Sequence, residues 1–488
     1  MLFNSFEFAI FLPLVFLIYW AIGYAHIQDT LKLRLQNAFV VLASYVFYGW
    51  WDWRFLILIA FTSLSSWGSG ILIDKSRESR VKRSKFWLWL NIIINLAILA
   101  VFKYYDFFVS EFGQLFGIQT DSLLLRIILP VGISFYTFQA LSYSIDVYRK
   151  KIAPTKDILA FFAYIAFFPQ LVAGPIERAT NLLPQFLTNR KFKYEQGIDG
   201  VRQIIWGFFK KIVIADNCAA YVDQVWAQHE VAGSGALLLA AVLFAIQIYG
   251  DFSGYSDIAI GTAKLFGIKL MRNFNNPYFS RDIAEFWRRW HISLTTWFRD
   301  YLYIPLGGSR VNKVKIVRNT FVIFLVCGLW HGANWTFLAW GAYHAILFLP
   351  LILLGKNRKY TDQIAANSIL PSCKEVLQMT LTFALVVLGL IIFRAETVSQ
   401  AWEYLCGIII PNSNTIPFMM HSWEYIPLMV VILFMFVMEW LNRGEEHGFA
   451  IHQTISNRWF RSMLYGGVVL MILLLGPSHT EQFIYFQF

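Results

Sequence analysis

Two histidines embedded among tryptophans and glycines are the residues of this sequence best suited to chemistry. His291 lies in EFWRRWHIS (residues 285–293), and His331 lies in GLWHGANW (residues 328–335). Imidazole changes its protonation near neutral pH, so a positioned histidine can act as a general acid or base. The stretch from 282 to 335 is therefore the part of the chain in which we expect a reaction.

The run that leads to His331 is apolar and uncharged from Thr320 onward, and Gly328 and Gly332 flank the histidine. Glycines four residues apart allow another helix backbone to come close. An ionisable residue at membrane depth is costly to bury, which makes His331 a functional candidate. As a proton acceptor in a dry, narrow site, it would suit acyl transfer from a thioester to a hydroxyl. The alternative is a structural histidine that bonds to a neighbouring carbonyl.

The segment around His291 has the periodicity of one amphipathic helix. Its aromatic face carries residues at helical spacing, namely Trp287, Trp290, His291, Leu294, Trp297 and Tyr301. Glu285 stands four residues before Arg289, a spacing at which the two side chains can pair. His291 is then either the second polar residue of a site or a core histidine that is merely hydrogen-bonded. The basic residues of another face, Arg288 and Arg299, either set orientation in a membrane or hold the phosphates of a nucleotide-bearing donor.

Other polar positions and motifs carry less chemistry. Asp251 and Asp257 would not share a helix face, so we interpret them as structural or tunnel-shaping residues. The motifs GxxxxGK(S/T), GxGxxG, HExxH and GxSxG do not occur, which leaves ATP hydrolysis, dinucleotide binding, zincin chemistry and a serine nucleophile elbow without support. The four cysteines are widely separated, so neither a disulfide framework nor a metal site is expected.

The elements that must position the histidines are membrane helices. The 488 residues are 57% hydrophobic and only 15% charged, whereas a soluble domain has about 25% charged residues. Apolar windows predict about eleven to thirteen full crossings, and they lie near residues 8–24, 37–50, 54–73, 86–102, 122–145, 156–174, 202–222, 234–250, 253–270, 316–331, 335–354, 375–393, 423–441 and 463–476. The net charge of +11 comes from short loops between these windows, so it sets orientation and does not indicate nucleic-acid binding.

Loop charges predict the topology. Lys and Arg crowd residues 75–85 and 149–151, which places both loops in the cytoplasm, whereas residues 396–424 contain neither and are expected outside. No cationic segment precedes the first apolar run, which is typical of an uncleaved first span. Alternation of the crossings between these loops then predicts that both the N-terminus and the C-terminus lie outside.

The middle of the chain is less regular than its ends. Pro130, Gly132 and Pro169 interrupt apolar runs, and Lys210 and Lys211 lie in a window, 202–222, that suits an interfacial helix better than a crossing one. Broken helices at membrane depth occur where protein or a water-filled cavity satisfies the backbone. We therefore expect one transmembrane domain over 1–488, with a catalytic core at about 122–355 and peripheral helices in 1–121 and 370–488.

Several motifs together resemble the membrane-bound O-acyltransferase (MBOAT) family. They are SYVFYGW (44–50), LPVGISFY (129–136), AGPI (173–176), residues 251–257, FWRRWHIS (286–293), FRDYLYI (298–304) and GLWHGAN (328–334). The similarity is greatest to the bacterial branch that includes the alginate O-acetyltransferase membrane subunit. It implies an all-α polytopic membrane protein, a ring of helices around a thinned centre that contains a tunnel, with interfacial and re-entrant helices among surrounding membrane lipid.

The resemblance also implies roles for residues and partners. His331 matches the catalytic histidine of the family and His291 the second polar residue of the site. Neighbouring substrate or tunnel candidates are Trp287, Arg288, Arg289, Trp290, Arg299, Asp300, Trp330 and Asn334. The implied donor is cytoplasmic acetyl-CoA, with no bound cofactor. A periplasmic SGNH-like acyltransferase would complete O-acetylation of a polysaccharide such as alginate, from an enzyme in the bacterial inner membrane.

Three alternatives stay open at this point. A D-alanyl transferase for teichoic acid would use an acylated carrier protein in place of acetyl-CoA. Peptidoglycan is an equally compatible acceptor for acetyl groups. A proton-coupled exporter could use His331 as a proton relay, although the sequence shows no internal repeat of the kind common in transporters.

Overall fold

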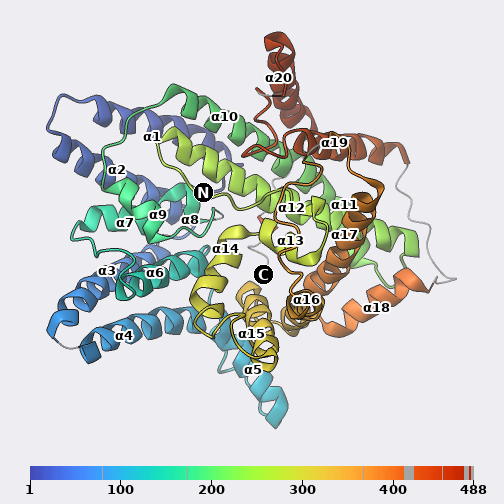
Figure 1. Ribbon diagram of the computed structural model, residues 1–488, viewed down its shortest axis with the longest axis horizontal. Helices are drawn as coiled ribbons and strands as arrows, with labels where there is room; N and C mark the ends of the chain where they lie inside the picture. The colour runs from blue at the N-terminus through green and yellow to red at the C-terminus, as the bar shows by residue number, and fades with distance from the viewer. Residues whose placement is uncertain are drawn as a thin grey trace. The chain divides into compact units, whose positions relative to one another are not determined.

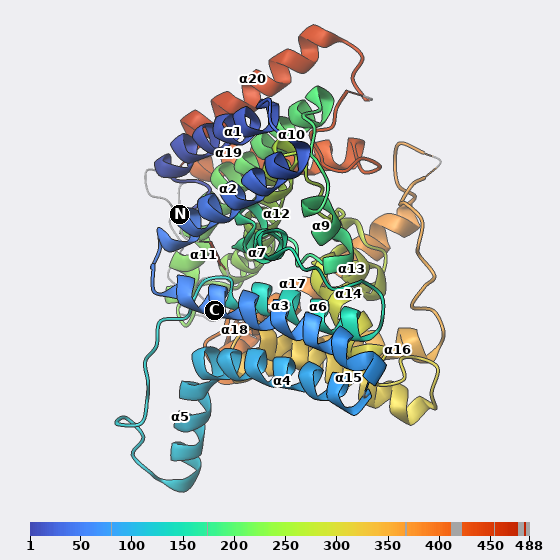
Figure 2. The same cartoon turned by 90° about the vertical axis from the view of Figure 1, so that its left-hand side faces the viewer.

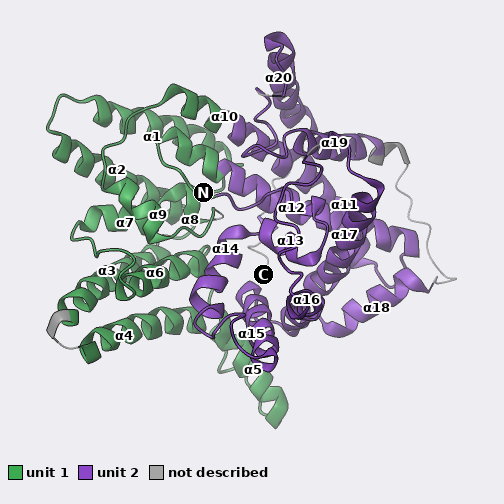
Figure 3. Ribbon diagram, viewed as in Figure 1, with its two compact units in different colours: residues 1–201, 259–271 green, residues 202–258, 272–488 purple. Residues whose placement is uncertain are grey.

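The computed structural model describes residues 1–79, 81–172, 174–366, 368–410, 422–452, 454–476 and 483–484, and within them all regular structure is helical. This confirms the predicted all-α class (Figure 1). The chain divides into two compact units, residues 1–201 with 259–271 and residues 202–258 with 272–488 (Figure 3). Two of the three points at which the chain passes from one unit to the other fall inside helices, α10 and α12, and the third lies between residues 271 and 272.

The first unit holds the helices of the N-terminal part of the chain. They are α1 (Phe6–Tyr24), α2 (Asp29–Gly49), α3 (Phe55–Ser79), α4 (Val81–Leu99), the π-helix η1 (Ala100–Tyr104), α5 (Tyr105–Phe116), α6 (Ile133–Tyr148), α7 (Ile158–Ala166), α8 (Phe168–Leu171), α9 (Ala179–Phe186) and the start of α10 (Tyr194–Phe208). Helices α3, α4 and α6 lie side by side, and α5 continues from α4 through η1 (Figure 2).

The second unit contains both histidine segments. Its helices are η2 (Phe209–Ala215, a π-helix), α11 (Asp216–Ala227), α12 (Ser234–Leu265, up to residue 258), the 3-10 turn η3 (Pro277–Phe279), α13 (Ile283–Arg289), α14 (Ile292–Phe298), the π-helix η4 (Arg299–Tyr303), α15 (Lys313–His331), α16 (Trp335–Leu353), α17 (Cys373–Arg394), α18 (Val398–Ile409), α19 (Ser422–Leu441) and α20 (Arg458–Leu475).

Eight helices of the described residues are long and apolar enough to cross a membrane, and a shorter apolar helix covers 426–441. The eight cover 6–24, 55–77, 81–116, 234–265, 313–331, 335–353, 373–394 and 458–475. Some of the apolar windows in the sequence are not single helices. The window 122–145 becomes helical only at Ile133, and the window 156–174 divides into α7 and α8.

The irregular middle that the prolines and glycines predicted is present. Gly132 precedes α6 with φ +75°, a left-handed conformation that glycine adopts without strain. A Cβ atom at this position would lie 2.5 Å from the carbonyl oxygen of Leu171, at the end of α8. Gly132 therefore allows the start of α6 to pack directly against the α8 backbone. Of the predicted motif at 173–176, Ala173 lies outside the described residues.

The structure explains Lys210 and Lys211 differently from the interfacial helix predicted for 202–222. Both lysines are buried, at 3% and 1% exposure. Lys210 Nζ lies 2.6 Å from Asp257 Oδ2, and Lys211 Nζ lies 2.9 Å from Asp251 Oδ1 and 2.6 Å from Asp216 Oδ1. The structural interpretation of the two α12 carboxylates is thus confirmed, because both serve as counter-charges for buried lysines.

The π-helix η2 turns both lysines into the protein. It inserts one residue into each turn over 209–215, which changes the faces on which Lys210 and Lys211 emerge. Burial by itself would lower the pKa of Lys211, but the charges of Asp251 and Asp216 outweigh it and hold this pKa above the usual value. Lys211 is therefore a cation buried together with its two counter-ions.

We expect Lys211→Ala to destabilise the protein by about 3–5 kcal/mol, because removal of one partner leaves buried carboxylates uncompensated. The midpoint of thermal unfolding of the detergent-solubilised protein measures this. Arg54→Ala is the control, because it breaks an exposed ion pair with Asp52 and should leave the midpoint unchanged. Equal midpoints for Lys211→Ala and the wild type would contradict the proposed stabilisation.

Candidate active site

The position of His331 depends on a tight hairpin between α15 and α16. His331 is the last residue of α15, and Asn334 caps the start of α16 by accepting a hydrogen bond from the backbone N–H of Thr336 (3.0 Å). A Cβ atom at Gly328 would collide with the carbonyl group of Phe337 on the facing helix. The prediction that Gly328 permits a close backbone approach is therefore confirmed, and the partner is α16 itself.

The imidazole of His331 is surrounded by aromatic rings and is 5% exposed. Its ring centroid lies 4.9 Å from that of Trp330, 5.1 Å from that of Trp340 on α16 and 5.1 Å from that of Phe393 on α17, each in an edge-to-face arrangement. These aromatic neighbours give the imidazole surroundings of low polarity. Such surroundings strengthen any interaction of the imidazole with a charge that develops during a reaction.

The single helix predicted around His291 is wrong. Helix α13 ends at Arg289, Trp290 is extended, His291 has φ +43°, and α14 begins at Ile292. The reason is a long-range contact that the local periodicity cannot reveal. The backbone N–H of Ile292 donates to the carbonyl of Asn273 (2.9 Å), and the N–H of Asn275 donates to the carbonyl of Arg289 (2.9 Å). These bonds to the 273–275 segment replace helical ones and hold the break open.

Asn273 also holds the His291 side chain, and sequence reasoning missed it. Its Oδ1 lies 3.1 Å from His291 Nδ1 and accepts hydrogen bonds from the backbone N–H and the hydroxyl of Ser293 (3.4 and 2.9 Å). Its Nδ2 donates to Ser256 Oγ (3.1 Å). Because the Ser293 N–H can only donate, the Asn273 oxygen must face this side, and His291 Nδ1 then carries the proton.

Burial decides the charge of His291. The side chain is 1% exposed, and desolvation lowers its pKa from 6.5 to about 3. His291 is therefore a neutral imidazole at physiological pH, with Nδ1 as donor and Nε2 as acceptor. Phe252 packs edge-to-face on its ring at 4.7 Å.

Trp330 contacts both candidate histidines. Its ring centroid lies 5.7 Å from that of His291 and 4.9 Å from that of His331. The structure thus brings His291, Trp330 and His331 into one aromatic cluster, although 40 residues of chain separate the two histidines.

A cavity opens beside His331, and we call it the aromatic cavity. The volume open to the centre of a water molecule is about 20 Å³, which is room for about one water-sized group. The lining residues come from α12, α13, α15, α16 and α17, and they are Ile248, Phe286, Trp287, Trp290, His331, Trp340, His344, Val386, Leu390 and Phe393. Trp287 and Trp290 thus share the cavity wall with His331, and their contact with a substrate stays a prediction.

His344 is the second histidine among these wall residues, and sequence reasoning missed it. It is 1% exposed, and its ring centroid lies 4.9 Å from that of Trp340 and 5.0 Å from that of Trp287. Its Nδ1 has no hydrogen-bond partner among the described residues. A Cβ atom at Gly389 would lie 2.9 Å from His344 Nε2, so this glycine makes room for the imidazole. The hairpin of α15 and α16 brings His344 into the same cavity wall as His331.

The predicted arginines of α13 hold the loop between α16 and α17. Arg289 Nη2 donates to Glu285 Oε1 (2.7 Å), which confirms the predicted pairing at i, i+4. Arg288 Nη2 donates to the carbonyl of Tyr360 (2.6 Å). Arg281, which the sequence did not single out, also bonds to Glu285 Oε1 (3.1 Å). All three guanidinium groups thus engage protein acceptors, and a role in binding donor phosphates stays a prediction.

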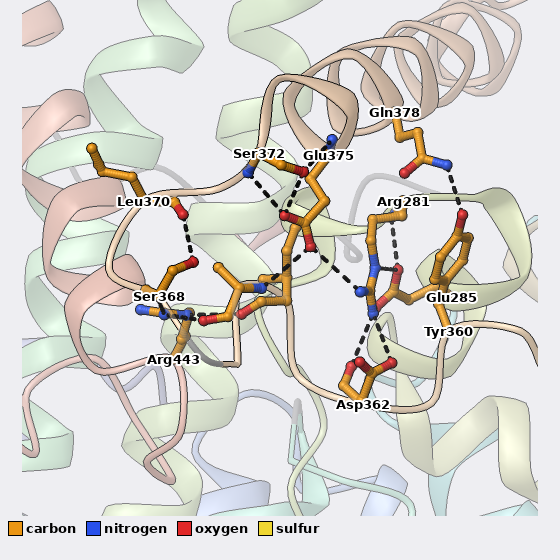
Figure 4. A network of polar contacts seen from close by, with 12 residues as sticks. Arg281, Glu285, Tyr360, Asp362, Ser368, Leu370, Ser372, Glu375, Gln378 and Arg443 are labelled. Atoms are coloured by element: carbon orange, nitrogen blue, oxygen red, sulfur yellow. Dashed lines mark hydrogen bonds and ion pairs between the residues drawn. The ribbon is translucent and has the colours of Figure 1, made fainter.

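Figure 4 shows the loop contacts of Arg281. Its guanidinium lies 3.2 Å from Asp362 Oδ1 and 3.7 Å from Glu375 Oε1, and it stacks over the ring of Tyr360 at 4.4 Å. Glu375 in turn completes a capping box with Ser372 at the start of α17. This network fixes the loop of residues 354–372 against α13, the helix that carries Trp287 into the cavity wall.

The remaining predicted residues do not line the aromatic cavity. Arg299 Nε lies 2.6 Å from Asp300 Oδ1 within η4. Asn334 donates through Nδ2 to the carbonyl of Glu396 (2.9 Å) and caps α16. Among the described residues, no group of three or more His, Cys, Asp or Glu side chains could hold a metal ion. Within the predicted outer loop of residues 396–424, residues 411–421 lie outside the described part of the chain.

Comparison with known proteins gives consistent matches. Residues 149–361 match the model of the membrane-bound O-acyltransferase family. The chain is 42% identical to the probable alginate O-acetylase AlgI of Pseudomonas aeruginosa, over 76% of this chain and 69% of that protein. It is 35% identical to a peptidoglycan O-acetyltransferase of Helicobacter pylori, over 84% and 80% of the two chains. It is 30% identical to a teichoic acid D-alanyltransferase of Streptococcus thermophilus, over 54% and 68%.

The low pKa of His291 predicts an acid sensitivity of folding. The pKa of His291 is about 3 in the folded protein and 6.5 in the unfolded chain, so between pH 3 and pH 6.5 only the unfolded chain binds the proton. The contribution of His291 to stability is therefore complete above about pH 6.5 and falls as the pH drops. The loss should be about 1.4 kcal/mol per pH unit. We expect His291→Gln to flatten the dependence of the unfolding midpoint on pH between 6.5 and 4.5.

The exposed residue His26 provides the control, since His26→Gln should keep the wild-type pH dependence. A His291→Gln protein with the same loss of stability on acidification as the wild type would show that His291 is not the group responsible.

Proposed function

Because the chain belongs to the membrane-bound O-acyltransferase family, a multi-pass membrane enzyme class, we propose that it transfers acetyl groups for O-acetylation of a cell-envelope or secreted polysaccharide. The observation that carries this proposal is the placement of His331 in the wall of a small aromatic cavity with room for a group of methyl size. The exporter alternative loses its basis, because the family and the similar proteins are acyltransferases.

His331 acts as the general base in this proposal. Its imidazole accepts the proton of an acceptor hydroxyl while the hydroxyl oxygen attacks the thioester carbonyl. The tetrahedral intermediate then collapses, the carbon–sulfur bond breaks, and His331 returns the proton to the departing thiolate. A low-polarity site excludes the water that would otherwise hydrolyse the thioester. A positioned base contributes typically about 10²–10⁴-fold to the rate of such a step.

In this proposal His291 orients the acceptor hydroxyl or a water and does not polarise the thioester carbonyl. With Nδ1–H directed to Asn273, its neutral ring offers only the Nε2 lone pair. A lone pair can hold a hydroxyl or a water by accepting its hydrogen bond, but it cannot donate to a thioester carbonyl. His291 is thus a positioning residue for the acceptor side of the reaction, next to the Trp330 ring that it shares with His331.

The donor, acceptor and partner follow from the relatives and from charge. The relatives include a probable alginate O-acetylase and a peptidoglycan O-acetyltransferase, so an acetyl donor, acetyl-CoA, and a glycan acceptor are the best-supported substrates. The similarity to a D-alanyltransferase keeps an acylated carrier protein as the second candidate donor. The basic residues of the loops support the proposal that the donor binds on the cytoplasmic side of the inner membrane and that both termini lie outside. A periplasmic SGNH-like acyltransferase is the proposed partner for transfer to the polymer.

Replacement of His331 by Ala should abolish acetylation, with a loss of about 10²–10⁴-fold because the general base is removed. The measurement is base-released acetate from exported polymer and from peptidoglycan of cells that carry the variant as the only copy. Replacement of the exposed His452 by Ala is the control and should leave acetylation at the wild-type level. Equal amounts of both variants in the membrane, with monodisperse elution in detergent, exclude a folding defect.

Wild-type acetate on both polymers in the His331→Ala strain would refute the catalytic assignment. Loss of acetate from only one polymer would identify the acceptor. Transfer by wild-type membrane vesicles from a D-alanyl carrier protein, with none from acetyl-CoA, would favour the second donor.

A further inference from the structure

Three aliphatic side chains complete the wall of the aromatic cavity. Ile248 comes from α12, and Val386 and Leu390 lie one turn apart on α17. All three belong to the same wall as His331, Trp287 and Trp340. Val386 and Leu390 are buried, at 2% and 6% exposure, and α17 packs against α16. The cavity is therefore limited in size by side chains that have no polar function.

The size of the cavity restricts what can lie beside His331. A cavity needs a volume of about 10–15 Å³ to hold one water molecule. The aromatic cavity, with about 20 Å³, therefore holds one group of about that size. The methyl group of an acetyl chain is of this size. A propionyl or butyryl chain needs one or two more methylene groups, and forcing these into a packed interior costs about 1–3 kcal/mol.

The polar atoms of the wall indicate a polar occupant. Trp287 and Trp340 are buried tryptophans whose indole Nε1–H groups find no acceptor in the described part of the chain. Most buried donors in proteins are hydrogen-bonded, and exceptions call for an explanation such as a ligand or an ordered water. Two donors in the wall beside a proposed base match a carbonyl oxygen, which gains negative charge when the acyl group is attacked.

We infer that the aromatic cavity is the chamber for the acyl group and that Val386 and Leu390 limit it to two carbons. This rests on the proposed acyl transfer and adds to it the residues that decide chain length. Trp287 and Trp340 donate to the acyl carbonyl, and the methyl group points to the aliphatic wall. The α17 residues thereby act as specificity-determining residues, because a longer chain meets their side chains before its carbonyl can reach His331.

The test compares acyl chains of two, three and four carbons. Acetyl, propionyl and butyryl thioesters are supplied to inverted membrane vesicles on coenzyme A and, in a parallel series, on acyl carrier protein, and the release of thiol is followed. The wild type should prefer acetyl over butyryl by at least about 10-fold, since each methylene group changes discrimination by about 1–3 kcal/mol. Leu390→Ala should raise the butyryl-to-acetyl rate ratio by about 10-fold or more.

Three variants complete the design. Val386→Ala should shift the ratio in the same direction, and it serves as the second enlargement if Leu390→Ala fails to fold. Leu388→Ala is the matched control, because Leu388 lies on the same helix, is 40% exposed and does not line the cavity, so its ratio should stay that of the wild type. Trp340→Phe removes the indole N–H, so acetyl transfer should slow by about 10-fold or more.

Unchanged chain-length ratios in folded Leu390→Ala and Val386→Ala proteins would overturn the inference while leaving acyl transfer intact. Equal wild-type rates with acetyl and butyryl thioesters would also overturn it. Absence of transfer from every thioester on both carriers would instead refute the proposed function, and the inference with it.

Discussion

The close contact between α15 and α16 is the constraint on which the proposed site depends. Gly328 on α15 meets the backbone of Phe337, and Gly341 on α16 meets the backbone of Phe324, so the two helices touch through glycines at both ends of their contact. Because lipid tails are as apolar as the side chains, the hydrophobic effect does not drive membrane helices together. Their association gains stability from close packing of this kind instead. The approach places His331 of one helix against Trp340 of the other. A larger residue at either glycine would separate the helices and widen the cavity between their side chains.

A second constraint is the backbone break at His291. A non-glycine residue with positive φ costs about 1–3 kcal/mol and persists only when its surroundings compensate. Here the compensation comes from the 273–275 segment, which bonds to the backbone on both sides of the break and, through Asn273, to the imidazole itself. The same contacts that offset the strain fix the donor nitrogen of His291. Backbone geometry and ring protonation are thus parts of one arrangement.

Sequence patterns predicted local features of this site and missed those that depend on tertiary contacts. Gly328 and the uncharged run before His331 are local signals, and they led to the correct expectations of a close helix approach and a buried histidine. The pairing of Glu285 with Arg289 is likewise a matter of helical spacing. The His291 break could not be predicted, because hydrophobic periodicity continues through it and only distant backbone bonds interrupt the helix. His344 was missed because its role depends on the antiparallel return of α16.

The separation of charge from the aromatic cavity shows how these constraints work together. The ionic groups of α12 and η2 are neutralised in pairs, Lys210 with Asp257 and Lys211 with Asp251 and Asp216. The cationic groups of α13 are likewise bound, with Glu285 accepting from Arg289. Among the described residues, those that line the cavity carry imidazole and indole groups but no carboxylate, lysine or arginine. In a low dielectric even a single unpaired charge would shift the proton affinity of an imidazole strongly. These ions pair with one another away from the cavity and leave its wall to neutral donors and acceptors. A neutral wall suits a reaction in which an imidazole accepts a proton during attack on a thioester.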